Sequence, residues 1–263
     1  MDNPGTARTP DAHGTQPRDA AHWAQRGTNL HVSDTPEHAV NLNVEGRKVV
    51  SPLQGFGPLW QKTYQVRLPG GLVSPEDLVR YWKDHFGALQ PKQNRFYAPR
   101  SGVAPGEVVL MNASAQGLPV NSGLLVLYAD DDSFTFMTPE GCPEAGWITC
   151  SAFRDDAETV AQVRTQGRSN DPIFEFGFRL FGAKQQERIW KYVLNHLAAQ
   201  YSISPEAEAM VERVCLDRRM QWGRVGNVWH NATIRSFFYA CLTPVRAVGR
   251  VGRGRKRGAV SQL

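Results

Sequence analysis

The side chains that could bind a metal or attack a substrate are spread along the chain without a recognisable catalytic spacing. The four cysteines form no C-x-x-C pair, and the sequence contains no H-E-x-x-H, G-x-S-x-G or G-x-x-x-x-G-K-S/T motif. Zinc sites, nucleophile elbows and phosphate-binding loops need such spacings, because their groups must converge on one point. His85 and His196 lie on apolar faces of predicted helices, where a hydrogen-bonded core histidine is the more frequent explanation. The sequence therefore predicts no catalytic residue, no metal ligand and no cofactor.

Two carboxylates, Glu140 and Glu144, fall on one predicted turn. A pair of carboxylates can serve as general acid and base when the environment separates their pKa values. On a single turn between strands, such a pair is more typical of a solvated hairpin tip.

The aromatic residues carry the most functional information, and they make up 10% of the chain. Large rings that face the inside of a sheet can line an apolar pocket, with a few polar groups at its ends. Four rings on elements expected to face each other are predicted to bind a ligand: Tyr64, Phe96, Trp147 and Trp190. The alternative is a filled core without a cavity.

Basic residues gather at the C-terminus. Six lie from Arg246 onward with no acidic residue among them, so the net charge of +5 leaves −1 for the rest of the chain. Such a tail can contact phosphates of RNA or DNA, or an anionic membrane surface, and a solubilising tail without a partner is the alternative. The predicted anion contacts are Arg250, Arg253, Arg255, Lys256 and Arg257.

No apolar run approaches the roughly 20 residues that span a bilayer, and the polar N-terminus lacks the order of a signal peptide. The sequence therefore predicts a cytoplasmic protein without a transmembrane segment, with at most weak peripheral contact to a membrane.

Periodicity predicts a strand over residues 59–68 and a helix that begins after Ser74. Six short strands without intervening helices follow up to residue 167, which favours an antiparallel meander. A long helix over residues 172–201, bent near Gly182, comes next, and Ser204 is predicted to start one more helix.

The chain is expected to divide into four parts. Residues 1–45 have few apolar side chains and predict a disordered leader that can be deleted without loss of the core. Residues 46–203 form the folded domain, residues 204–245 a helical extension, and residues 246–263 a polybasic disordered tail.

Residues 134–147 resemble the strand–turn–strand of an uncharacterised bacterial family in the START/polyketide-cyclase-like (SRPBCC) superfamily. Residues 55–60 and 169–172 fit the same family at the ends of its sheet. The resemblance covers roughly residues 55–201 and implies an α+β helix-grip fold, in which a curved antiparallel sheet of about six to seven strands surrounds a long C-terminal helix. Cys142 stands where that family has a histidine, so a proton-transfer role of that histidine is not expected in this chain.

The predicted function is non-catalytic binding of a small apolar or lipid-like ligand in the helix-grip cavity. One alternative is an enzyme of the cyclase or dehydratase type that uses polar groups in the same cavity. Another is an interaction protein with a vestigial cavity, whose basic tail contacts nucleic acid or a membrane.

Overall fold

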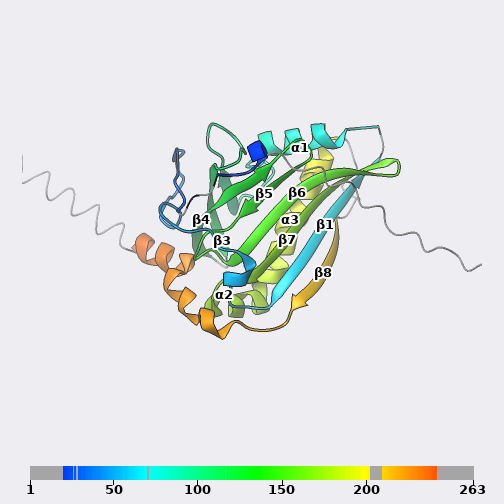
Figure 1. Ribbon diagram of the computed structural model, residues 1–263. Helices are drawn as coiled ribbons and strands as arrows, with labels where there is room; N and C mark the ends of the chain where they lie inside the picture. Colours follow the sequence, from blue (N-terminus) through cyan, green and yellow to red (C-terminus); the bar gives the residue numbers. More distant parts are fainter. Residues whose placement is uncertain are drawn as a thin grey trace, which may run out of the picture.

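An eight-stranded antiparallel sheet is the frame of the molecule, and it curves around one long helix (Figure 1). The computed structural model describes residues 20–25, 27, 29–69, 71–115, 117–201 and 209–241. The strands lie in the order β2-β3-β4-β5-β6-β7-β1-β8, so the first strand of the chain sits between β7 and β8. The strands are β1 (Leu59–Leu68), β2 (Asn94–Tyr97), β3 (Val108–Ala115), β4 (Leu118–Ala129), β5 (Ser133–Met137), β6 (Glu144–Asp155), β7 (Glu158–Ser169) and β8 (Met210–Asp217).

The helices begin at the signals that the sequence contains. Ser74 accepts a hydrogen bond from the backbone N–H of Asp77 and caps α1 (Pro75–Asp84). Asp171 accepts from the N–H groups of Ile173 and Phe174 at 2.8 and 2.9 Å and caps α2 (Pro172–Gly177). In both helices a proline follows the cap, where its missing N–H costs no hydrogen bond.

The predicted long helix is a continuous helical segment of three parts. After α2 comes the π-helical segment η3 (Phe178–Gly182), and then α3 (Ala183–Ala199). The change from π-helical to α-helical geometry falls at Gly182, where the sequence predicts a bend. Three 3₁₀ helices complete the described elements, η1 (Ala20–His22), η2 (Pro52–Gln54) and η4 (Trp222–His230), and residues 232–241 are helical.

The core lies between the concave face of the sheet and the helices α1 and α3. Because side chains alternate between the two faces of a strand, every second residue of β1, β6 and β7 points into it. Tyr64, Val66 and Leu68 of β1 are buried there against Val193 and Leu194 of α3. This arrangement confirms the predicted α+β helix-grip fold with its antiparallel sheet.

The predicted helix after Ser204 is wrong for residues 210–217, which form the edge strand β8 paired with β1. Val211 lies opposite Tyr64, and Cys215 opposite Trp60. The prediction rests on Ser204 as a cap and on Met210, Val211 and Val214 as the inward side of a helix, but residues four apart, such as Met210 and Val214, share a face in a strand as well as in a helix. The start of the predicted helix, residues 204–208, lies outside the described residues.

The predicted disordered leader is wrong for residues 29–45. Leu30, Val32 and Val44 are buried against Val108 and Leu110 on the convex face of the sheet. Leu30 and Val32 are two residues apart, but this pair is too short to indicate a strand and Val44 stands alone, so only tertiary contacts reveal their role. Residues 1–19 lie outside the described part of the chain.

Among the described residues, no helix combines the length and apolar character needed to cross a membrane.

Candidate functional site

An inner cavity of about 180 Å³ lies between the sheet and the junction of α2, η3 and α3. Its walls come from β2, β3, β4 and β6 on one side and from η3 and α3 on the other. Most of the wall is apolar, with Phe96, Met111, Leu124, Ile148, Ile189 and Trp190 as its large side chains. An apolar space with a few polar groups is the usual form of a small-molecule site.

Phe178 closes one end of the inner cavity. A Cβ on Gly182 would lie 2.7 Å from Cδ1 of the Phe178 ring, so the glycine leaves the space that this ring occupies. Both residues belong to η3, whose π-helical geometry changes the register between α2 and α3. Single π-helical turns inside α-helices occur frequently at functional sites.

Glu144 and Gln186 form the polar end of the cavity, and both contact the buried Lys62. The Nζ atom of Lys62 lies 3.5 Å from Oε1 of Glu144, and the two side chains are 9% and 21% exposed. Gln186 of α3 joins them, since it accepts from Lys62 and donates to Glu144. The Lys62 ammonium also lies 5.6 Å from the centroid of the Phe178 ring, within range of a cation–π contact.

A second space, the lateral pocket, has a volume of about 230 Å³ and lies on the other side of Phe178. Glu144 and Phe178 line both this pocket and the inner cavity, whereas Trp60 and Lys62 line the lateral pocket alone. The two spaces are thus divided by one ring and one carboxylate.

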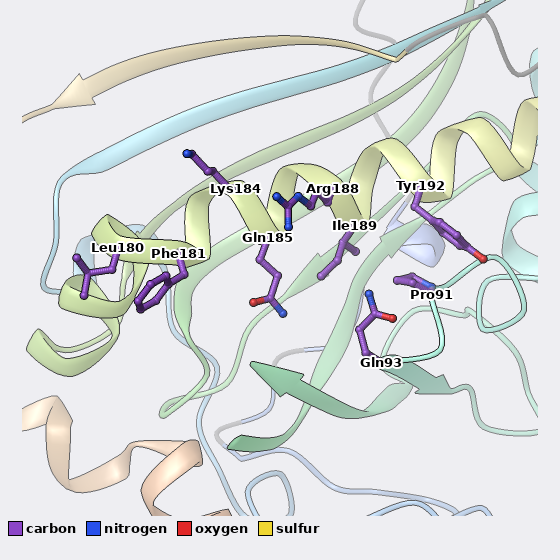
Figure 2. A pocket seen from close by; sticks show the side chains of 9 residues that line it. All are labelled: Pro91, Gln93, Leu180, Phe181, Lys184, Gln185, Arg188, Ile189 and Tyr192. Carbon is purple, nitrogen blue, oxygen red and sulfur yellow. The ribbon is translucent and has the colours of Figure 1, made fainter. Parts of the chain in front are cut away.

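An outer groove of about 520 Å³ runs along α3 (Figure 2). In Figure 2, Gln185 and Ile189 point from α3 toward the side where Gln93 lies, while Lys184 points away from it. Gln93, Gln185 and Ile189 line both the groove and the inner cavity, so the two spaces adjoin.

Tyr64 is buried on the concave face, two residues along β1 from Lys62. Its hydroxyl has no hydrogen-bond partner among the described residues. Burial, and then the charges of Glu144 and Glu187, raise the pKa of Tyr64 above its ordinary value. The phenol is therefore a neutral donor near the polar end of the site.

The four rings predicted to line the cavity are placed differently from one another. Phe96 and Trp190 line the inner cavity. Tyr64 faces the same interior but packs in the core beside it.

Trp147 was predicted to face inward, and this is wrong. Its neighbour Ile148 points to the core, so Trp147 lies on the convex face, where its Nε1 donates to Gln166 at 3.0 Å. The basic residues predicted to contact anions, from Arg250 to Arg257, lie outside the described residues.

Three groups of the polar end were missed as site residues: Lys62, Glu144 and Gln186. The sequence did contain a signal for Lys62, because it is two residues from the inward-facing Tyr64 on the same strand. Glu144, expected at a solvated tip, is instead the first residue of β6 and faces the cavity.

Cys142 also lines the inner cavity. Burial raises the pKa of its thiol to about 12, so the thiol stays protonated and is a poor nucleophile. Among the described residues, no group of three or more His, Cys, Asp or Glu could hold a metal ion.

Several solved structures are similar to this chain. A Thermus thermophilus protein aligns over 54% of this chain and 97% of its own length, with 18% identity and a TM-score of 0.42. The protein Ara h 8.0201 aligns over 53% of this chain and 99% of its own length, with 13% identity and a TM-score of 0.38. The di-domain ARO/CYC StfQ from the steffimycin biosynthetic pathway aligns over 54% of this chain and 51% of its own length, with 9% identity and a TM-score of 0.40.

These identities and TM-scores are too low to transfer a ligand or an activity. No protein-family model and no curated protein matches the sequence. The sheet order and the helix enclosed by the sheet nevertheless define the architecture directly. The chain therefore has a helix-grip fold, in which the antiparallel sheet curves around α3.

Proposed function

We propose that this protein binds a small, mainly apolar molecule in the inner cavity without transforming it. The observation that carries the proposal is the cavity itself, an apolar space of about 180 Å³ that adjoins the outer groove. Packed cores leave few voids larger than a water molecule, and an apolar cavity of about 150 Å³ can bind benzene. The space suits a ligand of one or two rings, or part of a longer chain that continues into the groove.

The polar end supports a ligand with one polar group. Glu144 and Gln186 line this end, and the Glu144 carboxylate can accept a hydrogen bond from a ligand. A ligand hydroxyl group near this end would gain a charge-assisted hydrogen bond to the carboxylate. The proposed ligand is therefore apolar along most of its length and carries a hydrogen-bonding oxygen at one end.

A cyclase or dehydratase role needs an acid, base or nucleophile prepared for reaction inside the cavity. Cys142 lines the cavity, and burial raises the pKa of its thiol, which disfavours attack by the thiolate. No contact of the described residues favours the enzyme over the binding protein, so the proposal is limited to binding.

A pair of fluorescent probes tests the proposal. 2-Naphthol carries a hydroxyl group that naphthalene lacks, and both match the size of the cavity. We expect the protein to bind both, with 2-naphthol about tenfold tighter because of the hydrogen bond at the polar end.

Two leucine variants provide the matched control. Ala113 lines the cavity, whereas Ala152 is in the packed core. Ala113→Leu should lower probe affinity at least about tenfold with little change in stability, whereas Ala152→Leu should cost about 1–3 kcal/mol and leave the affinity of the folded protein unchanged. Absence of probe binding by the wild-type protein, or equal affinity in Ala113→Leu, would contradict the proposal.

A further inference from the structure

The outer side of α2 and η3 carries apolar side chains that contribute little to the core. Ile173, Phe176, Leu180 and Phe181 are 48%, 66%, 50% and 51% exposed. Their spacing places them along one side of a helical segment. The inner side of the same segment is occupied by Phe178, so closing the cavity does not require this outer stripe.

The helix η4 extends this surface with two tryptophans. Trp222 and Trp229 are 71% and 83% exposed, and η4 contacts α2, beside which it is drawn in orange in Figure 1. We call the six residues of the two segments the apolar face: Ile173, Phe176, Leu180, Phe181, Trp222 and Trp229.

Polar contacts, rather than these tryptophans, hold η4 in place. Asn227 Nδ2 donates to the backbone oxygens of Gln54 and Asn170 at 2.8 Å. Just after η4, Asn231 Nδ2 donates to Asp171 Oδ2 at 2.8 Å. Trp222 makes one edge-to-face ring contact, with Phe56, yet most of its surface remains exposed. The segment is thus attached by amides, and its aromatic side chains point outward.

The charge next to η4 is positive. The described residues 218–241 contain four Arg and no Asp or Glu. Arg218, Arg219 and Arg224 are exposed next to or within η4. On α2 the nearby carboxylate, Glu175, is buried and bonded to Ser169 and to Arg179, whose own side chain is 63% exposed.

We propose that the apolar face docks on an anionic lipid membrane surface. Exposed tryptophan and phenylalanine side chains insert at the boundary between headgroups and acyl chains, and arginines around them attract acidic headgroups. Ile173 and Leu180 favour lipid over nucleic acid as the partner, because aliphatic side chains cannot stack on bases in the way that aromatic rings do. Docking is a further activity that does not depend on ligand binding in the cavity.

The position of this face gives docking a consequence for the proposed ligand. Leu180 and Phe181 belong to the apolar face and also line one end of the outer groove (Figure 2). A membrane held against the face would therefore lie beside the outer groove, which shares lining residues with the inner cavity.

Vesicle binding by the full chain tests the proposal. Co-sedimentation and tryptophan fluorescence are measured with vesicles of phosphatidylcholine alone and of phosphatidylcholine with about one third phosphatidylserine. We expect binding to the mixed vesicles, with a blue shift of tryptophan emission, and at least about tenfold weaker binding to the neutral vesicles. Raising the salt concentration should weaken binding to the mixed vesicles.

Variants distinguish insertion of the apolar face from electrostatic attraction alone. The double variant Phe176→Ser, Trp229→Ser should bind the mixed vesicles at least about tenfold more weakly than wild type, since two large side chains no longer insert. Leu72→Ser is the matched control, because Leu72 is 51% exposed in the loop before α1 and outside the face. Arg218→Gln with Arg224→Gln should reduce binding about fivefold per residue.

Three results would overturn the proposal: no binding of wild type to mixed vesicles, equal binding by the Phe176→Ser, Trp229→Ser variant, or equal loss in Leu72→Ser. Binding of a single-stranded RNA oligonucleotide without binding to vesicles would identify nucleic acid as the partner and would overturn it too. Probe binding in the cavity, measured on the same samples, reports separately on the proposed function.

Discussion

The space between the sheet and α3 is filled differently at its two ends. At the end covered by α1, the rings of Trp82 and Phe134 lie 5.7 Å apart in an edge-to-face arrangement, and those of Phe86 and Phe136 lie 5.0 Å apart. At the end covered by α2 and η3, the inner cavity and the lateral pocket flank Phe178. We refer to these as the packed end and the open end.

The same sheet serves both ends, so the difference arises from what covers it and from a few inward positions. At the packed end, α1 presents a regular apolar side with Leu78, Val79 and Trp82 buried. At the open end, Lys62, Glu144 and Gln186 point into the interior. Charged groups need polar partners, so apolar side chains cannot close around them as they close around Trp82. One curved sheet can thus provide a stable core and a binding space side by side.

Removing a ring from each end should show the largest difference. Trp82→Ala leaves a cavity in a close-packed cluster and should lower the free energy of unfolding by about 3–5 kcal/mol. Phe178→Ala enlarges existing space and loses a cation–π contact with Lys62, so we expect a loss below about 2 kcal/mol. Urea unfolding of both variants measures the difference, and equal losses would mean that the open end is as tightly packed as the other.

Breaking the buried ion pair should have the next largest effect. Lys62→Met leaves Glu144 without its cation, and because that carboxylate is 21% exposed we expect a loss of about 1–3 kcal/mol, below the cost for a fully buried pair. The double variant Lys62→Met, Glu144→Leu should recover part of this loss, since no charge remains unpaired. Urea unfolding at neutral pH is the measurement. A single variant as stable as wild type would show that water screens the pair.

The cap of α2 should make the stability of the open end depend on pH. Burial raises the pKa of Asp171, and the hydrogen bonds from Phe174, Asn231 and Ile173 offset this only in part. Because the folded-state pKa is the higher one, this group's contribution to stability is fully present below its unfolded pKa of about 3.9 and is lost as pH rises through the folded-state pKa.

Asp171→Asn keeps a capping side chain but removes the titration. The stability of this variant minus that of wild type should therefore increase between about pH 4 and pH 7, whatever constant offset the altered contact with Asn231 adds. Urea unfolding across this range supplies both values. A difference that stays flat or decreases would show that the carboxyl is not destabilised by burial.

Much of the fold could be predicted because its signals are local. The alternation in β1 and the cap-plus-proline pairs before α1 and α2 need no knowledge of distant residues. β8 was not predicted, because the four-residue spacing of Met210 and Val214 fits both a helix and a strand. Residues 29–45 were not predicted, because the burial of Leu30 and Val44 depends on Val108 and Leu110, far along the chain.

The site was less predictable, since it depends on which face of a strand each residue occupies. Side chains alternate between the two faces of a strand, and Trp147 and Ala152 are an odd number of residues apart on β6. Only one of the two can therefore face the interior. Ala152 is in the core, and Trp147 is therefore outside. Glu144 could not be assigned from the sequence, because its direction depends on where β6 begins after the turn. The π-helical register of η3, which aims Phe178 inward, has no sequence signature beyond Gly182.

The smallest effect is expected at the boundary between the two ends, where Tyr64 packs in the core near the polar end. Its hydroxyl is buried without a hydrogen-bond partner among the described residues, and such a group costs free energy relative to its solvated state. Tyr64→Phe removes the oxygen but keeps the ring, so we expect unchanged stability or a gain of up to about 1 kcal/mol. Binding of 2-naphthol and naphthalene is then measured on the same variant. If the hydroxyl belongs to the open end, 2-naphthol binding weakens severalfold and naphthalene binding does not, whereas equal affinities for both probes would place Tyr64 functionally in the packed end. A loss of stability above about 1 kcal/mol would mean instead that the hydroxyl has a partner in the folded protein, and the description of this boundary would be wrong.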